Sequence, residues 1–377
     1  MSDPWPSETA ARATASTPVF FTTFGMVLAS IAALLVFDLW LARIDARESR
    51  MHALHLFQDG ESLLAASQPT EAADRFASAQ ALERSNVRYA VALAEALLAD
   101  GRVNEAEVQL RSVLGRAETD GAANLVMARI LAREGRPDDA VAFYHRAIYG
   151  EWAADSSRQA LHARLELIDL LARREAGHGL LAELLPLQDT DPDSVDLRRR
   201  LGHLFLLADS PERALPFFRE LLKRDPDDGD AYAGMAEAAL LLGNFRTARA
   251  DLVIATRLIP DSTRFATLLE VADTVLALDP LARGIGHVAR FERARTVLRL
   301  SADATSACAS SAGSRQLADS ARVLLSAGNG AGSDGDAEAA DAFLDLAGEL
   351  WSRRDARCTA ERSPTMRALA LIQKKLT

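Results

Sequence analysis

Cysteine is scarce in this sequence, where Cys308 and Cys358 are the only two cysteines among 377 residues. Two thiols are too few for a zinc site of four cysteines or for the disulfide framework that holds many small secreted domains together. They leave two alternatives open, a single disulfide between Cys308 and Cys358 or two unpaired buried thiols. A disulfide would close a loop of about 50 residues and would need an oxidising compartment.

Positive charge is also in short supply, because the formal net charge is -10 at pH 7. Lysine occurs only at positions 223, 374 and 375, and arginine supplies the remaining positive charge. A nucleic-acid-binding domain usually carries a basic surplus to meet the phosphate backbone. The sequence therefore predicts no nucleic-acid partner.

Motifs of catalysis and cofactor binding are missing as well. The sequence has no His-Glu-x-x-His helix motif, no Gly-x-Ser-x-Gly turn, and no Gly-Lys-Ser/Thr after its glycine-rich stretch at 327–336. That stretch is predicted to be a flexible loop. We expect a protein that is not an enzyme, with no cofactor and no metal site.

One long apolar run stands near the start, at residues 18–42, after a short N-terminal tail at 1–17. At about 1.5 Å per helical residue, this run is long enough to cross a hydrocarbon core of about 30 Å. A cleaved signal peptide would have a shorter apolar core, a basic leader and a small-x-small cleavage site. The run is therefore predicted to be an uncleaved transmembrane anchor in the inner membrane.

The orientation of this anchor is left with two alternatives. Arg43, Arg47 and Arg50 follow the run and only Arg12 precedes it, which favours a cytoplasmic C-terminal side by the positive-inside rule. A disulfide between Cys308 and Cys358 would instead place that side outside the cytoplasm. We expect the extracytoplasmic, periplasmic arrangement and keep the cytoplasmic one as the alternative.

A repeat with a period of 34 residues fills the middle of the chain. Ala248 and Pro260 match Ala214 and Pro226, each 34 positions earlier, and the frame continues toward the N-terminus with a small residue followed four positions later by a large apolar one. Six residues, 155–160, are inserted between two of the repeats. The frame defines six segments: 53–86, 87–120, 121–154, 161–194, 195–228 and 229–262.

This pattern resembles the tetratricopeptide repeat family of helix-turn-helix repeats. The resemblance implies an all-α fold, a right-handed α-solenoid, because no single helix pair buries its apolar face alone and neighbours must stack. Residues 263–377 are predicted to form an irregular helical region that caps the last repeat. The whole is expected to be a membrane-anchored protein of bacterial type.

In the family resembled, the first helix of each repeat lines a concave groove that holds a peptide segment or a partner helix. The corresponding groove-facing residues in this sequence are Arg88, Val91, Glu95, Arg129, Arg133, His162, Asp169, Arg173, Arg199, His203, Asp230 and Glu237. A basic stripe that binds an acidic partner segment is predicted from four of them, Arg129, Arg133, Arg173 and Arg199. The alternative is a solvated helical face with local ion pairs, such as one between Asp169 and Arg173.

The resemblance implies a scaffold or assembly factor that binds other proteins in its groove. Two further functions stay open at this point. One is a cytoplasm-facing adaptor that regulates a membrane enzyme, and the other is a non-catalytic subunit of an envelope transferase or polysaccharide complex.

Overall fold

The computed structural model describes residues 17–174, 177–188, 194–308, 311–327, 337–354 and 363–376, with side chains from Met26 onward. Across these ranges the chain is helical and forms no β-strand, which confirms the predicted all-α class. The chain divides into two compact units, Met1–Glu166 and Leu167–Thr377. The predicted tail up to residue 16, the predicted loop at 328–336 and Cys358 lie outside the described residues.

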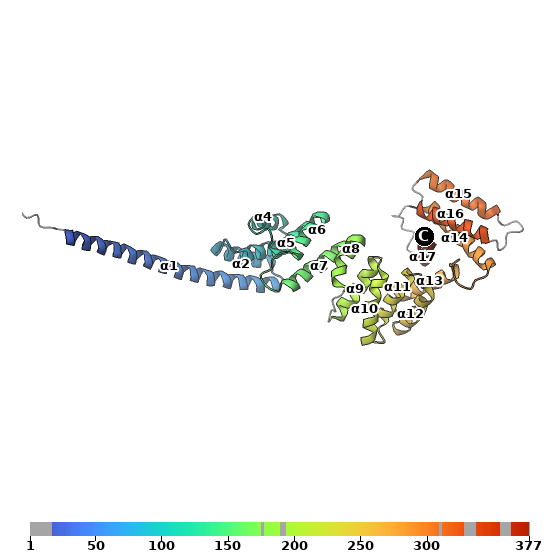
Figure 1. The fold of residues 1–377 in the computed structure, drawn as a ribbon, viewed down its shortest axis with the longest axis horizontal. Helices are drawn as coiled ribbons and strands as arrows, with labels where there is room; N and C mark the ends of the chain where they lie inside the picture. Colours follow the sequence, from blue (N-terminus) through green and yellow to red (C-terminus); the bar gives the residue numbers. More distant parts are fainter. Residues whose placement is uncertain are drawn as a thin grey trace, which may run out of the picture. The chain divides into compact units, whose positions relative to one another are not determined.

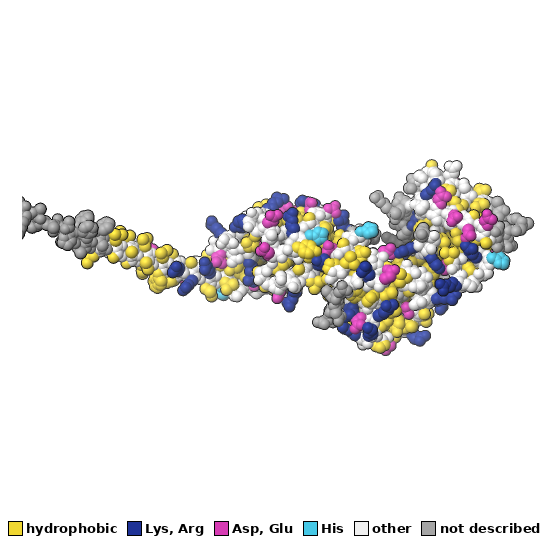
Figure 2. All heavy atoms as spheres, viewed as in Figure 1, with side chains coloured by type: hydrophobic (Ala, Val, Ile, Leu, Met, Phe, Trp, Pro, Cys, Tyr) yellow, Lys and Arg dark blue, Asp and Glu magenta, His cyan; other side chains and the backbone are white. Residues whose placement is uncertain are grey.

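The first unit begins with an unusually long helix, α1, which runs from Thr17 to Ala65 without a break (Figure 1). Its N-terminal part is apolar but exposed from Met26 on, and Figure 2 shows this stretch as a run of hydrophobic side chains followed by arginines. Its C-terminal part is different, because Ala53 is fully buried and Phe57 is 2% exposed. The apolar run and the first repeat helix are thus parts of one helix.

An exposed apolar helix near the N-terminus is a feature shared by membrane spans and signal sequences. Among the described residues, α1 is the one helix long and apolar enough to cross a membrane. The exposure of its apolar side chains distinguishes it from a core helix of a soluble protein, which would be largely buried.

Helix pairs follow α1 in the first unit. They pack as successive hairpins and end with a longer helix that continues past Glu166 into the second unit. These helices are α2 (Pro69–Leu82), α3 (Val87–Ala99), α4 (Val103–Leu114), α5 (Gly121–Arg133), α6 (Pro137–Ile148) and α7 (Ser156–Arg173). The residues inserted before the fourth predicted repeat form the first turns of α7, which is why this first helix is longer than α3 or α5.

The second unit continues the hairpins and then departs from them. The short helix α8 and a 3-10 turn stand in the irregular fourth repeat, and further helices follow the last regular hairpin. Its elements are α8 (Gly177–Leu184), η1 (Leu185–Leu187), α9 (Val195–Leu207), α10 (Pro211–Arg224), α11 (Gly229–Leu241), α12 (Phe245–Leu258), α13 (Thr263–Leu278), α14 (His287–Ala307), α15 (Ala312–Ala327), α16 (Ala337–Ser352) and α17 (Pro364–Leu376). The exact repeat boundaries stay a prediction.

The small residues of the repeat allow neighbouring helices to pack closely. Phe218 of α10 lies between two glycines, Gly202 of α9 and Gly234 of α11. A Cβ atom on Gly234 would come within 2.3 Å of the Phe218 ring, and one on Gly202 within 2.8 Å. Both glycines are therefore required by packing, since the large ring fills the space that their side chains would occupy.

In five hairpin turns of the described ranges, one residue lies in the left-handed backbone region. Glycine takes this place at Gly101, Gly135 and Gly243, with φ between 72° and 82°. The other two turns of this kind have Ser67 and Asp209 there, at φ values of 59° and 52°. A side chain costs energy in this region, although aspartate is tolerated there better than most residues, so Ser67 and Asp209 are the two turn residues that differ from the glycine pattern.

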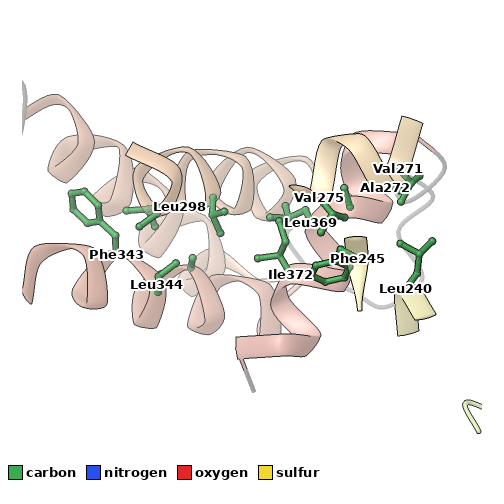
Figure 3. Packing of buried hydrophobic residues seen from close by; sticks show 14 of the residues in the cluster. Leu240, Phe245, Val271, Ala272, Val275, Leu298, Phe343, Leu344, Leu369 and Ile372 are labelled. Atoms are coloured by element: carbon green, nitrogen blue, oxygen red, sulfur yellow. The ribbon is translucent and has the colours of Figure 1, made fainter. Parts of the chain in front are cut away.

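The helical C-terminal region predicted from the sequence is present, and it includes a helix that the sequence did not predict, α17. Ala368, Leu369 and Ile372 of α17 are buried in a core shared with α13, α14 and α16. Figure 3 shows Leu369 and Ile372 beside Val275 of α13 and Phe245 of α12. The last helix thus packs against the first helix of an earlier hairpin.

Candidate functional site

The first helices of the repeats in the first unit line two adjoining pockets, with volumes of 680 and 600 Å³. Residues of α3, α5 and the connection after α6 belong to both pockets, so the two form a continuous groove. We call it the first-unit groove. The shared residues are Arg88, Val91, Glu95, Ala122, Trp152 and Ala153.

Trp152 forms one wall of the first-unit groove, and its position follows from the local backbone. The connection after α6 pairs with the segment before α5, because Glu151 N–H donates to Thr119 at 2.8 Å and Gly121 N–H donates to Glu151 at 2.8 Å. The indole Nε1 donates to the Ala147 carbonyl oxygen at 2.9 Å. A Cβ on Gly121 would fall 2.4 Å from the ring, so the missing side chain allows Trp152 to pack there.

The floor of the groove is apolar. Phe57 and Leu64 of α1, Val91 of α3, and Leu125 and Val126 of α5 line it. Such a surface recognises apolar side chains of a ligand, while nearby polar groups set its orientation.

Charged residues on the groove side are paired with one another from helix to helix. Arg129 of α5 contacts Glu95 of α3 at 2.8 Å and makes two hydrogen bonds to Glu166 of α7, at 3.0 Å from Nε and 2.7 Å from Nη2. Arg88 of α3 contacts Glu61 of α1 at 3.2 Å, and its guanidinium lies 4.4 Å from the Phe57 ring centroid. These contacts tie each first helix of the unit to the next.

The Arg129–Glu166 pair is half-buried, and this sets its protonation. Burial alone would raise the pKa of Glu166, but the hydrogen bonds and the charge of Arg129 outweigh it and hold the pKa below its ordinary value of 4.5. Burial likewise opposes the charge of Arg129, and Glu166 outweighs that effect and raises the pKa of Arg129. Both groups are charged at neutral pH.

The second unit has the same kind of helix-to-helix pairing. Arg199 of α9 contacts Asp228 at 2.7 Å, and Asp228 also caps α11 by accepting from Ala231 N–H at 2.9 Å. Glu237 of α11 pairs with Arg264 of α13 at 2.8 Å. Asp169 pairs with Arg200 of α9 and not with Arg173, because the ion pair forms between neighbouring helices and not along one helix.

The four arginines considered as a basic stripe are mostly satisfied by protein acceptors. Arg129 and Arg199 are paired with carboxylates, and Arg133 donates to the Leu98 carbonyl oxygen at 2.6 Å. Arg173 is exposed, and no ion pair of Arg173 is found within the described ranges. The structure thus offers few uncompensated guanidinium groups for an acidic segment, and a role of these arginines in binding stays a prediction.

His203 and Glu237 lie together in the second unit, at a pocket of 490 Å³ on the side formed by the first helices. The His203 ring packs edge-on against Phe218, with ring centroids 5.1 Å apart, and its Nδ1 lies 4.0 Å from Glu237. Burial lowers the pKa of His203, so the ring is neutral at pH 7. Part of this pocket is walled by α17.

Of the two cysteines predicted to pair, only Cys308 lies within the described residues. Cys308 ends α14, is 8% exposed and is disulfide-bonded. Cys358 lies outside the described residues, so its pairing with Cys308 stays a prediction. No three His, Cys, Asp or Glu side chains of the described chain come together in a way that could hold a metal ion.

Sequence reasoning missed three elements of these surfaces. Glu166 is not among the predicted groove residues, although it stands on the groove side of α7 and accepts from Arg129. Trp152 falls near the end of the third repeat in the 34-residue frame. Gly150, which follows the end of α6 two residues before Trp152, was the available signal. The third is α17, whose adjacent Lys374 and Lys375 make up two of the three lysines of the chain.

Comparison with known proteins gives a family match in both units. A family model of the tetratricopeptide repeat matches residues 63–130, 97–165 and 205–271. No curated protein matches the chain.

Solved structures with a similar fold include PilW, described as a widely conserved type IV pilus biogenesis factor, at 18% identity over 58% of this chain and 98% of that one, with a TM-score of 0.41. A tetratricopeptide repeat protein from Parabacteroides merdae matches at 15% identity, over 79% of this chain and 99% of that one, with a TM-score of 0.39. The TPR2AB domain of yeast Sti1, in complex with pHSP90, matches at 18% identity, over 73% and 98%, with a TM-score of 0.28.

Proposed function

Because this chain is a tetratricopeptide repeat protein, a family of protein-binding scaffolds that are generally not catalysts, we propose that it is a membrane-anchored scaffold that binds a partner protein in its first-unit groove. The observation that carries the proposal is the apolar floor of that groove, walled by Trp152 and bordered by charges that are already paired. The partner segment is expected to present apolar side chains, since few free cations remain for an acidic one.

The apolar, exposed N-terminal half of α1 supports the anchor. The disulfide at Cys308 supports an extracytoplasmic repeat region, because disulfides persist in oxidising compartments. We therefore propose a single-pass inner-membrane protein with its repeats in the periplasm, acting in the assembly of envelope protein complexes.

Site-specific photo-crosslinking in living cells tests this function. A photoreactive phenylalanine analogue at Ala122, which lines both pockets of the groove, should yield a crosslinked adduct with a partner that mass spectrometry identifies. The same analogue at Ala142, an exposed alanine on α6, is the matched control and should yield none. Equal adducts at both positions, or none at either, would contradict groove binding.

Salt dependence separates an apolar partner from an acidic one. Binding that depends on apolar contacts should change little between 0.05 and 0.5 M salt, that is between roughly a 14 Å and a 4 Å screening length. A loss of affinity of tenfold or more over this range would instead support a basic groove and an acidic segment.

A further inference from the structure

The C-terminal helix α17 lies against the first helices of the hairpins in the second unit, and its residues line a pocket together with residues of α9, α11 and α13. Its last turn reaches the turns that follow three helices, α9, α11 and α13, each of which is the first of a hairpin. Lys374 contacts Asp209 at 2.5 Å, and Lys375 contacts Asp279 at 2.8 Å and lies 5.1 Å from the Phe245 ring centroid. The C-terminal ends of helices carry partial negative charge, which favours lysines at this place.

Asp209 stands in the left-handed turn position that glycine occupies in three other hairpins. Its carboxylate contacts Lys374, which is 165 residues further along the chain. This contact gives the turn after α9 a charged partner on α17 that a glycine at the same place would not provide. Asp279 is 3% exposed, so its pairing with Lys375 also compensates a buried charge.

The apolar side of α17 adds to the contacts that hold this helix against the second unit. Leu369 and Ile372 are buried against α13 and its neighbours (Figure 3), and Gln373 Nε2 donates to Ser301 Oγ of α14 at 3.0 Å. A helix with apolar residues three apart and basic residues in its last turn is thus the chemistry that fits this face.

The fit is incomplete on one side. The pocket of 490 Å³ remains between α17 and the first helices, with the apolar lining residues Leu206, Leu207, Leu240, Leu241, Ala370 and Leu371. Leu207 is 50% exposed there. The small side chain of Ala370 leaves space that a larger apolar residue on a similar helix would fill.

We propose that the face of the second unit formed by α9, α11 and α13 is a binding site for an amphipathic helix with a basic last turn, and that α17 occupies it in cis until a partner helix of the same chemistry replaces it. This inference extends the proposed scaffold function to a second site. It is independent of the first-unit groove, whose test uses residues of the other unit.

A tethered helix has an effective concentration in the millimolar range, so a partner must bind more tightly than α17 to replace it. A partner helix can gain this extra affinity from the space beside Ala370, because apolar side-chain atoms that fill the space leave water and gain packing contacts. A partner helix with leucine at the place of Ala370 therefore has an advantage over α17 itself.

The test uses a fluorescent synthetic peptide of residues 363–377 and the full-length chain in detergent, with binding followed by anisotropy. In the chain with Lys374→Glu and Lys375→Glu, α17 is held less tightly against the second unit. This chain should bind the peptide at least tenfold more tightly than the wild-type chain. The matched control, Lys223→Glu with Arg224→Glu on the exposed end of α10, should behave as the wild type. A peptide with Ala370→Leu should bind every chain about tenfold more tightly than the native peptide.

Two further measurements guard against a variant that merely unfolds. Lys374→Gln removes only one of the two lysine charges of α17 and leaves Asp209 and Asp279 in place for the peptide, so it should keep its helical circular dichroism and still bind the peptide several-fold more tightly than the wild type. In the wild-type chain, a saturating amount of the Ala370→Leu peptide should speed hydrogen exchange of the amides in α17. Equal affinity for all chains, no binding to any chain, or unchanged exchange in α17 would each overturn the proposal.

Discussion

The Arg129 guanidinium donates two hydrogen bonds to the Glu166 carboxylate, at 2.7 and 3.0 Å. Glu95 on the other side of Arg129 adds a contact at 2.8 Å, so a single arginine joins three successive first helices. The charges that the sequence suggests as a ligand site thus connect the repeats to one another, which is why we propose the apolar floor beside them as the binding surface.

Replacing Glu166 with glutamine should destabilise the first unit in a pH-dependent way. The pKa of Glu166 is lowered in the folded chain, so its contribution is present at pH 7 and is lost as the pH falls below about 4.5. We expect Glu166→Gln to lower the free energy of unfolding by about 1–3 kcal/mol at pH 7 and by less at about pH 3.5. Urea unfolding followed by circular dichroism at both pH values measures the difference.

Glu105→Gln is the control for that experiment, because Glu105 pairs with Arg102 on the exposed surface of α4. Exposed pairs contribute little, so this variant should unfold as the wild type does. A difference between the wild type and Glu166→Gln that is the same at both pH values would contradict a role of the charged pair.

Replacing Gly234 with alanine should destabilise the second unit by about 1–3 kcal/mol, since the new Cβ would displace the Phe218 ring. Gly313→Ala is the matched control, as a Cβ at this helical position meets only an atom at 3.9 Å. The control should be neutral or stabilising by about 0.5–1 kcal/mol. Thermal unfolding of both variants decides the matter, and equal midpoints would show that the Phe218 packing tolerates a methyl group.

Cys308 and Cys358 should be protected from maleimide-polyethylene-glycol in intact cells, in permeabilised cells and in denatured protein, and become reactive only after reduction. A disulfide between them closes a loop of about 50 residues and should stabilise the C-terminal region by roughly 4 kcal/mol relative to the reduced chain. Thiols that react once the inner membrane is opened, without reduction, would place the repeats in the cytoplasm and favour the adaptor function.

The apolar half of α1 should hold the intact chain in the membrane. After an alkaline carbonate wash we expect the protein in the membrane pellet, with the mass of the full chain, 40.7 kDa. Intact-mass spectrometry distinguishes this from a chain shortened by a signal peptidase. A soluble product that lacks roughly the first 40 residues would identify α1 as a signal sequence.

The sequence was sufficient for the repeats because a period of 34 residues repeats the same packing requirement in each hairpin. Glu95 and Arg129 are 34 positions apart, so their pairing follows the frame, and a register argument reaches it. Glu166 lies 37 positions after Arg129, in the repeat that the inserted residues disturb, and the frame does not point to it. Only the structure brings these three side chains together.

The place of α17 was beyond sequence reasoning for a different reason. An amphipathic helix shows which of its faces is buried, but its pattern does not tell which of several apolar surfaces it covers. The contact between Lys374 and Asp209 spans 165 residues, and no local signal encodes such a pairing. The aspartate at a turn position that glycine holds in three other hairpins was the nearest clue.

Because α1 is continuous, the anchor that we propose and the first repeat rotate together as one helix. Each residue of an α-helix turns the chain by about 100°, so the direction in which the first-unit groove opens is fixed relative to the exposed apolar part of the proposed anchor. Adding one residue between Ala42 and Ala53 would turn the groove about the helix axis by that angle. Adding about seven residues would bring the groove back to within about 20° of its original orientation. The number of residues in this short stretch therefore sets the direction in which the groove opens around the axis of α1.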